Sequence, residues 1–484
     1  MAADSYTKAS STSKLLRMRA GDRAKPRRGD AAGPERSFGS SAILASLALA
    51  GSFAALGLNS ISISRIEGPD GAGLIALSSQ FIFLATFVAG AGLRTSVTYR
   101  VGAGLWSARS AVRGALKAAF VLGIAGAAVG MGLWALLRDG ALSDFSPLMA
   151  GSLMAALPFA LAWWIVPAIP LAQERFEAYA ALTVSAPASV LLLCPALALL
   201  AGETGAVIGF AGGYVVGGSV SSLWALRHAR DPTAAHGPEH GLRRAGGFGA
   251  RAWVNDLFAL INLRPDLFIL SAYFGTADTG VYAVTVSITS LVWIVSQPLA
   301  SVVLPRNAGI AAADPGLAPE LSASEQNAAA RHSVVVSLAA GLAVVPILAL
   351  APFVWGEGFE DTLRLGLIML PGVVLLGIGR VMVAAFTGAG AANQALLVGL
   401  VSFPLTFIAF LLVIPDHGST GAAIVSCCSY VAAALLAAVL FFRAPGTSPR
   451  QALMPRGADL RDYERLARRL WGGLPIARSA RASR

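Results

Sequence analysis

Four ionisable side chains interrupt apolar stretches in the second half of the sequence: Asp256, Arg264, Asp266 and Arg380. A charge inside a bilayer costs about 2.5–3.5 kcal/mol on insertion scales and usually faces a protein interior or a transport pathway. Arg264 lies about fourteen residues after the start of its apolar stretch, which is near the bilayer middle at about 1.5 Å per residue. A guanidinium binds oxyanions such as phosphate with two parallel hydrogen bonds. These residues therefore indicate an anion-binding path inside a membrane.

Further polar residues accompany Arg264. Asn255, Asn262 and Asp266 fall on one side of a helix, whereas Arg264 lies on the other, because residues two apart point in nearly opposite directions. We therefore name five candidate substrate-binding residues: Arg264, Asp266, Asn262, Arg380 and Asn255. The alternative role for these charges is a structural ion pair, for example between Asp266 and Arg380.

Apolar stretches of bilayer-spanning length recur along the whole chain, and each crossing needs about 20 residues. The chain has 484 residues, of which 56% are hydrophobic and 13% charged, with a mean hydropathy of +0.67. This composition excludes a soluble domain, and we predict an all-α polytopic membrane protein of about twelve transmembrane helices. The predicted spans are 40–63, 71–92, 116–137, 147–171, 178–201, 204–226, 250–274, 279–304, 332–355, 365–386, 391–414 and 418–442.

Lys and Arg residues collect on one side of these spans. Both terminal segments are basic, as are the loops after the second and sixth spans, whereas the opposite loops are short and often acidic. The positive-inside rule then places both termini in the cytoplasm, and we expect a bacterial inner membrane. The net charge of +11 lies in tails and loops, so no nucleic-acid partner is expected.

The chain divides into two similar halves. We predict a disordered basic tail at 1–38, a six-helix lobe at 39–227, a linker at 228–249, a second six-helix lobe at 250–443 and a basic tail at 444–484. The spacing of leucines in the last tail favours an amphipathic helix on anionic lipid, and a solvated tail is the alternative.

A short internal repeat supports the duplication. GPDGAGLIAL begins at Gly68 and GTADTGVYAV begins at Gly275, and in each a second glycine follows five residues after the first. Both segments open a span at the equivalent place in their half. In transporters with such repeats, the substrate path lies at the interface of the halves near the membrane midplane.

No motif indicates an enzyme. The sequence shows no phosphate-binding loop, no Ser/His/Asp arrangement and no His/Cys metal spacing, and its three cysteines lie inside apolar stretches. We therefore expect no cofactor, no metal and no catalytic residue. Transport through the membrane would then be passive or coupled to an ion gradient.

Three stretches resemble bacterial polysaccharide flippases of the multidrug, oligosaccharidyl-lipid and polysaccharide exporter superfamily: 64–102, 171–180 and 262–306. The last one carries an Arg and an Asp before a Gly-Val-Tyr-Ala segment: Arg264, Asp266, Gly280, Val281, Tyr282 and Ala283. The resemblance implies two lobes around a central cavity. It also implies a substrate, a lipid-linked oligosaccharide on undecaprenyl diphosphate, that moves from the inner to the outer leaflet by alternating access.

Membrane lipids and other polysaccharide assembly proteins are the expected partners. The first half departs from this family pattern, because the apolar cores of its spans carry no cations that could line the cavity. Three alternatives remain open: an ion-coupled multidrug exporter of the same superfamily, a lipid II flippase, and a membrane-embedded glycan polymerase or glycosyltransferase. The first would need buried carboxylates in the first half, the second usually has fourteen spans and more cavity cations, and the third would need a large outer loop.

Overall fold

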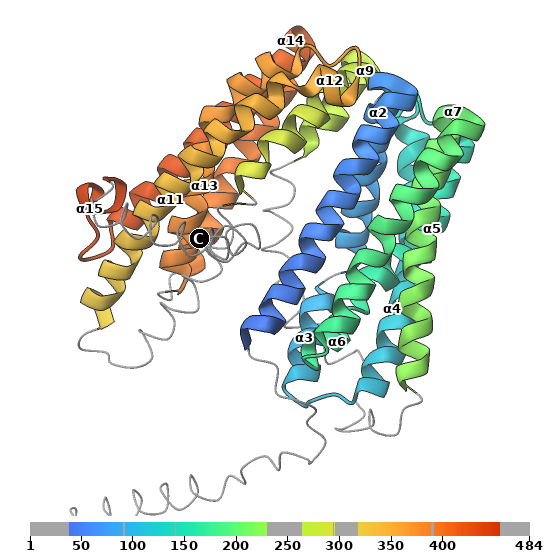
Figure 1. Ribbon diagram of the computed structural model, residues 1–484, viewed down its shortest axis with the longest axis horizontal. Coiled ribbons are helices and arrows are strands. Elements are labelled where there is room, and N and C mark those ends of the chain that lie inside the picture. Colours follow the sequence, from blue (N-terminus) through green and yellow to red (C-terminus); the bar gives the residue numbers. More distant parts are fainter. Residues whose placement is uncertain are drawn as a thin grey trace, which may run out of the picture. The chain divides into compact units, whose positions relative to one another are not determined.

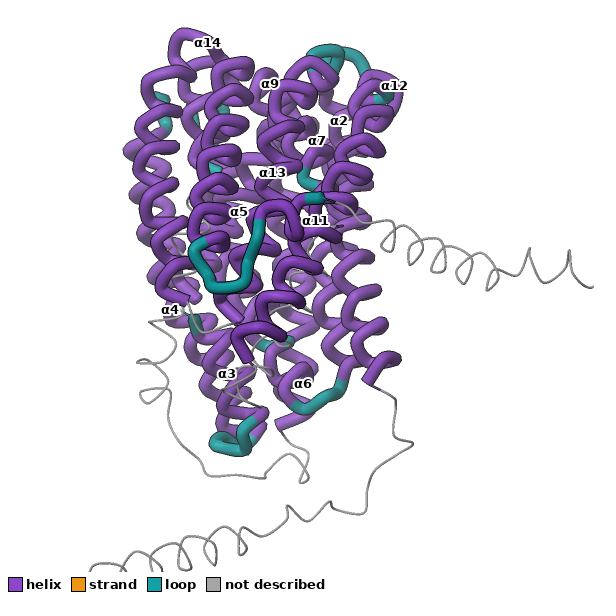
Figure 2. The backbone as a smooth tube through the Cα atoms, turned by 90° about the vertical axis from the view of Figure 1, so that its left-hand side faces the viewer, coloured by secondary structure: helices purple, strands orange, loops and turns teal. Residues whose placement is uncertain are grey.

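The computed structural model is built from helices throughout its described residues (Figure 2). These residues are 38–90, 92–140, 142–229, 264–293, 295, 318–388 and 392–454. Within them no strand occurs, and the contacts discussed below belong to one compact unit, Ala45–Arg484. The predicted fold class, an all-α polytopic membrane protein, is confirmed.

Twelve helices make up the described chain, and Figure 1 labels each of them. Their bounds are α2 Phe38–Gly90, α3 Leu93–Gly102, α4 Ala108–Leu137, α5 Pro147–Ile165, α6 Ala168–Ala172, α7 Phe176–Ala229, α9 Pro265–Thr289, α11 Ala318–Ala349, α12 Ala351–Trp355, α13 Thr362–Gly388, α14 Ala392–Phe442 and α15 Pro449–Leu453.

Four of these helices are hairpins whose two limbs reverse direction at a glycine. The turns lie at Gly68 in α2, Gly202 in α7, Gly275 in α9 and Gly418 in α14, with φ values of 68°, 59°, 80° and 55°. Only glycine adopts such left-handed angles at no steric cost. Each turn therefore ends one span and starts the next without a connecting loop.

Close contacts between the limbs of α7 show how tightly a hairpin can pack. A Cβ atom at Gly205 would lie 1.9 Å from the carbonyl oxygen of Leu197, and one at Gly217 would lie 2.4 Å from Cβ of Ala186. The two pairs straddle the turn at Gly202, so the limbs are antiparallel neighbours. Small residues at helix interfaces are what allows such an approach in membrane proteins.

The number of spans follows from these hairpins. Eight helices in the described part of the chain are long and apolar enough to cross a membrane. The four hairpins are among them, so the described residues hold twelve crossing segments, the seventh of them only from Pro265 onward. This count agrees with the predicted number.

The helices of each half pack in the same order. In the first half α5 lies against both α4 and α7, and in the second half α13 lies against both α11 and α14 (Figure 1). Glycines mediate both sets of contacts: Gly123 of α4 meets Pro158 of α5, and Gly372 of α13 meets Cys427 of α14. A hairpin, two single spans and a second hairpin thus occur twice along the chain.

Several helices extend beyond the predicted spans. α4 begins at Ala108 rather than at 116, because the Ser107 hydroxyl accepts a hydrogen bond from Ser110 N and caps the helix earlier. The basic loop before it contains α3, and α11 begins at Ala318 rather than at 332. Polar helical turns continue the spans beyond the apolar residues that hydropathy detects.

The tails and the linker fall largely outside the described residues, which begin at 38, omit 230–263 and end at 454. The predicted N-terminal tail, most of the linker 228–249 and the amphipathic helix near the C-terminus are therefore not described. One unpredicted feature follows α14. The short helix α15 packs on α11, where Asn327 bonds to both Gly446 O and Ser448 N, and Arg331 donates to Gln451 O.

Candidate functional site

A cavity lies where α2, α9 and α14 meet. Its volume is about 250 Å³. The lining residues come from the second limb of α2, the first limb of α9 and the first limb of α14: Gln80, Phe83, Leu84, Arg264, Pro265, Phe268, Ile269 and Phe407. Among these described residues, Arg264 carries the only charge, and the amide of Gln80 is the only other polar side chain.

The start of α9 positions Arg264 at the edge of this cavity. Pro265 occupies the first turn of the helix, where its missing N–H costs nothing. Arg264 precedes it with φ −142° and ψ 11°, outside the helical range, so its side chain leaves the helix before the regular spiral begins. No ion pair within the described part of the chain engages its guanidinium.

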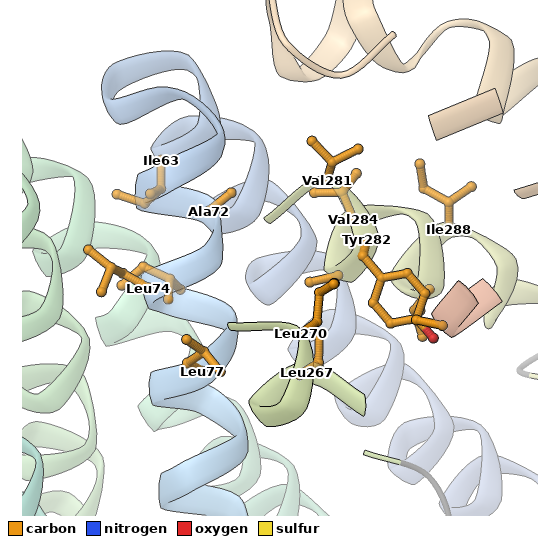
Figure 3. Close-up of a cluster of buried hydrophobic side chains, with 14 of the residues drawn as sticks. Ile63, Ala72, Leu74, Leu77, Leu267, Leu270, Val281, Tyr282, Val284 and Ile288 are labelled. Atoms are coloured by element: carbon orange, nitrogen blue, oxygen red, sulfur yellow. The ribbon is translucent and has the colours of Figure 1, made fainter. Parts of the chain in front are cut away.

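Asp266 lies on the other side of α9, inside the second half. Its side chain is 1% exposed, and Oδ2 accepts a hydrogen bond of 2.6 Å from the Tyr282 hydroxyl. The same hydroxyl lies 2.9 Å from the Ser426 hydroxyl on α14, and Oδ1 accepts a bond from Leu267 N. Figure 3 shows Tyr282 among the apolar side chains of this core, with Leu267 and Leu270 from the first limb of α9. Asp266 therefore ties the two limbs of the hairpin to each other, and Tyr282 ties them to α14.

Arg380 on α13 is separate from both residues. Its guanidinium stacks over the ring of Trp293 at 4.5 Å from the ring centroid. Trp293 in turn packs edge-on against Tyr430 at 5.6 Å and donates to the Val373 carbonyl. The alternative ion pair between Asp266 and Arg380 does not form, because each side chain has a different partner. Arg380 is not among the described residues that line the cavity.

The other candidates cannot be placed. Asn255 and Asn262 lie in 230–263, outside the described residues, as does Asp256. Of the five named residues, the structure thus brings Arg264 to the cavity, buries Asp266 against Tyr282 and leaves Arg380 stacked on Trp293. No group of three His, Cys, Asp or Glu side chains in the described ranges is arranged to hold a metal ion.

Sequence reasoning missed the other residues that line the cavity with Arg264. The cavity uses three phenylalanines from three helices, Phe83, Phe268 and Phe407. Nothing in a single apolar span distinguishes a phenylalanine that lines a cavity from one that faces lipid. Gln80 had a detectable signal, because it is the only Gln, Asn or charged residue in the predicted span 71–92.

Comparison with known proteins identifies the fold. No family model and no curated protein sequence matches the chain. Among solved structures, the inward closed conformation of lipid II flippase MurJ matches with a TM-score of 0.67 at 14% identity, covering 84% of this chain and 89% of that one. An inward-facing multidrug resistance MATE family transporter of the MOP superfamily matches with a TM-score of 0.61 at 15% identity, covering 81% and 94%. An outward-facing structure with the same description matches with a TM-score of 0.55 at 15% identity, covering 83% and 93%. The chain therefore shares the fold of these multi-pass membrane transporters.

Proposed function

We propose that this protein is a flippase that moves undecaprenyl-diphosphate-linked oligosaccharide from the inner to the outer leaflet of the bacterial cytoplasmic membrane. It would do so by alternating access, as part of polysaccharide biosynthesis and export. No catalytic step is needed, because the substrate leaves chemically unchanged. The fold it shares with a lipid II flippase and with multidrug transporters supports a transport role.

One observation carries the choice of substrate: among the described lining residues of the cavity, a single arginine carries charge, and all the others except Gln80 are apolar. A polyprenyl diphosphate joins an anion directly to a hydrocarbon chain, and the same cavity is lined by a cation and by three phenylalanines. Arg264 can hold two phosphate oxygens at once, and such charge-assisted bonds are about twice as strong as neutral ones. Hydrogen bonds to the anion offset part of the cost of moving it through the membrane.

The same arrangement argues against the drug-exporter alternative. A cationic drug would meet a positive charge at the cavity, with no carboxylate among its described lining residues to balance it. The first half, where such exporters would carry coupling carboxylates, has no acidic residue inside its predicted spans. Asp266, a buried acid of the second half, accepts a hydrogen bond from Tyr282 and does not line the cavity.

The proposal includes the topology and the two lobes. With both termini in the cytoplasm, the turns at Gly68, Gly202, Gly275 and Gly418 face outward. The repeated order of hairpin, two spans and hairpin supports lobes at 39–227 and 250–443 joined by the linker 228–249. Co-expressed fragments 1–235 and 236–484 should then restore some export, and reporters fused after Thr233 and Arg450 should both report cytoplasm. A periplasmic signal from either reporter would remove the topology.

The test of the site is the replacement of Arg264. Arg264→Ala should abolish glycan export while the protein still accumulates in the membrane. Arg264→Lys should keep a fraction of export, because the charge remains and the planar fork is lost. Arg138→Ala is the matched control, because it also removes a guanidinium. The Arg138 side chain is largely exposed, and its Nε lies 3.9 Å from Oδ1 of the exposed neighbour Asp139. Normal export by Arg264→Ala at normal protein levels would place the substrate site elsewhere.

A further inference from the structure

The two halves meet through a reciprocal contact beside the turns at Gly68 and Gly275. A Cβ atom at Gly73 would lie 1.9 Å from the Thr276 carbonyl oxygen, and one at Gly280 would lie 2.0 Å from the Pro69 carbonyl oxygen. Pro69 and Gly73 hold the same places after Gly68 that Thr276 and Gly280 hold after Gly275. The repeated segments therefore pack against each other backbone to backbone, which only glycine permits at these positions.

A second set of bonds flanks this contact on one side only. Arg65 Nε donates to the Val354 carbonyl at 2.9 Å, and its Nη2 donates to the Phe353 carbonyl. Both acceptors lie at the C-terminal end of α12, where helix carbonyls lack internal partners. Trp355 Nε1 also donates to the Ser60 hydroxyl at 3.2 Å. α2 of the first half is thus bonded directly to α12 of the second.

The duplication does not extend to these bonds. Counted back from the turn glycine, the position of Arg65 in the first half corresponds to Ala272 in the second. The alanine side chain has no hydrogen-bond donor, so Ala272 cannot make the bonds that Arg65 makes. The Thr276 hydroxyl donates to Asp70 at 2.8 Å and adds one further bond between the halves.

We propose that Arg65, Trp355 and the Gly73–Gly280 contact form a latch that holds the two halves together at the turn end of the molecule and that must open in each transport cycle. The inference rests on the proposed transport function. Arg65 suits a releasable latch because it is exposed, so water replaces the two carbonyls when it leaves. The glycine contact suits the closed state because the two backbones pack closely there, and it can open because no ion pair has to be broken.

The test measures the distance between the halves directly. Spin labels at Ser143→Cys in the first half and Asp416→Cys in the second, both exposed sites, report the separation of the turn ends. The measurement uses the full chain, purified in lipid nanodiscs, with Cys194, Cys427 and Cys428 replaced. We expect one main distance for the parent protein. Arg65→Ala should raise the share of a longer distance by about tenfold, the factor typical for losing hydrogen bonds to a charged group.

Gly73→Ala should raise the same share, because its methyl group cannot fit against Thr276. Two matched controls should leave the distances unchanged: Gly57→Ala, on the same helix with open space around its Cβ, and Arg138→Ala. Trp355→Phe removes the bond to Ser60 and little volume. If either main variant fails to fold, this variant takes its place, and it too should raise the share of the longer distance.

Unchanged distances in folded Arg65→Ala would overturn the arginine clamp, and unchanged distances in folded Gly73→Ala would overturn the glycine contact as part of the latch. Arg264→Ala should leave the distances as in the parent while export is lost, so this result separates failure of the latch from failure of the proposed function.

Discussion

The hydrogen bond between Tyr282 and Asp266 should be a main stabilising contact of the second half. Tyr282 is completely buried, and its hydroxyl lies 2.6 Å from Asp266 Oδ2 and 2.9 Å from Ser426 Oγ. Tyr282→Phe keeps the ring and removes both bonds. It leaves a buried carboxyl group with Leu267 N as its remaining partner within the described residues.

The magnitude follows from the burial of the pair. Losing a hydrogen bond to a charged or strongly polar buried group costs about 1.5–3 kcal/mol. For a chain of this size we expect Tm to fall by about 1.5–3 °C, since larger proteins shift less per kcal/mol. Thermal unfolding of purified protein in nanodiscs, followed by intrinsic fluorescence, measures this change. Ser426→Ala should have a smaller effect, because the bond from Tyr282 to Asp266 remains.

Tyr273→Phe is the matched control. Tyr273 lies on the same helix, two residues before Gly275, but it is 59% exposed. The same chemical change should therefore leave Tm within error. Equal shifts in both variants would refute the idea that the buried pair stabilises the hairpin, because the hydroxyl at 282 would then contribute no more than one at the surface.

Three further changes test other contacts. Gly213→Ala should lower the free energy of unfolding by about 1–3 kcal/mol, the usual cost of overpacking, because its Cβ would lie 2.4 Å from Val190. Gly151→Ala, where the Cβ would meet open space, should leave the same unfolding assay unchanged. Asn327→Ala should speed proteolysis after α14, since it removes the bonds from Asn327 to Gly446 O and Ser448 N and leaves the bond from Arg331 to Gln451 O, and unchanged cleavage rates would contradict this docking. Burial and nearby acids raise the pKa of Glu203, so the folded state loses stability as pH rises through the interval from the unfolded to the raised pKa. Glu203→Gln should then raise Tm at pH 7 and not at pH 4, and an equal change at both pH values would argue against this coupling.

Hydropathy predicted the number and position of the spans, because a bilayer imposes length and apolarity on each crossing. It did not predict that pairs of spans would join through single glycines, although Gly68 and Gly275 were recognised as a repeat. Their positive φ angles depend on the approach of neighbouring limbs, which a local pattern does not record. α3 was missed for a related reason, since its polar residues resemble those of a loop.

The sequence also identified Arg264 as unusual but not its surroundings. Its depth in an apolar stretch was visible, whereas the cavity depends on α2 and α14, which are far away in the chain. The partner of Asp266 could have been found with the hairpin in mind. A reversal at Gly275 brings 266 opposite 282, and a tyrosine at that position is a natural donor to a buried carboxyl group.

Transport by purified protein in liposomes tests the central claim most directly. The vesicles would contain an undecaprenyl-diphosphate-linked oligosaccharide with a fluorescent label on the sugar, and a membrane-impermeant quencher would report its leaflet. We expect the protein to accelerate movement of the labelled lipid between leaflets, and the Arg264→Ala variant to remove that acceleration. If the protein leaves the labelled lipid in place but exports cationic dyes from the same vesicles, the proposed substrate is wrong and the multidrug alternative holds.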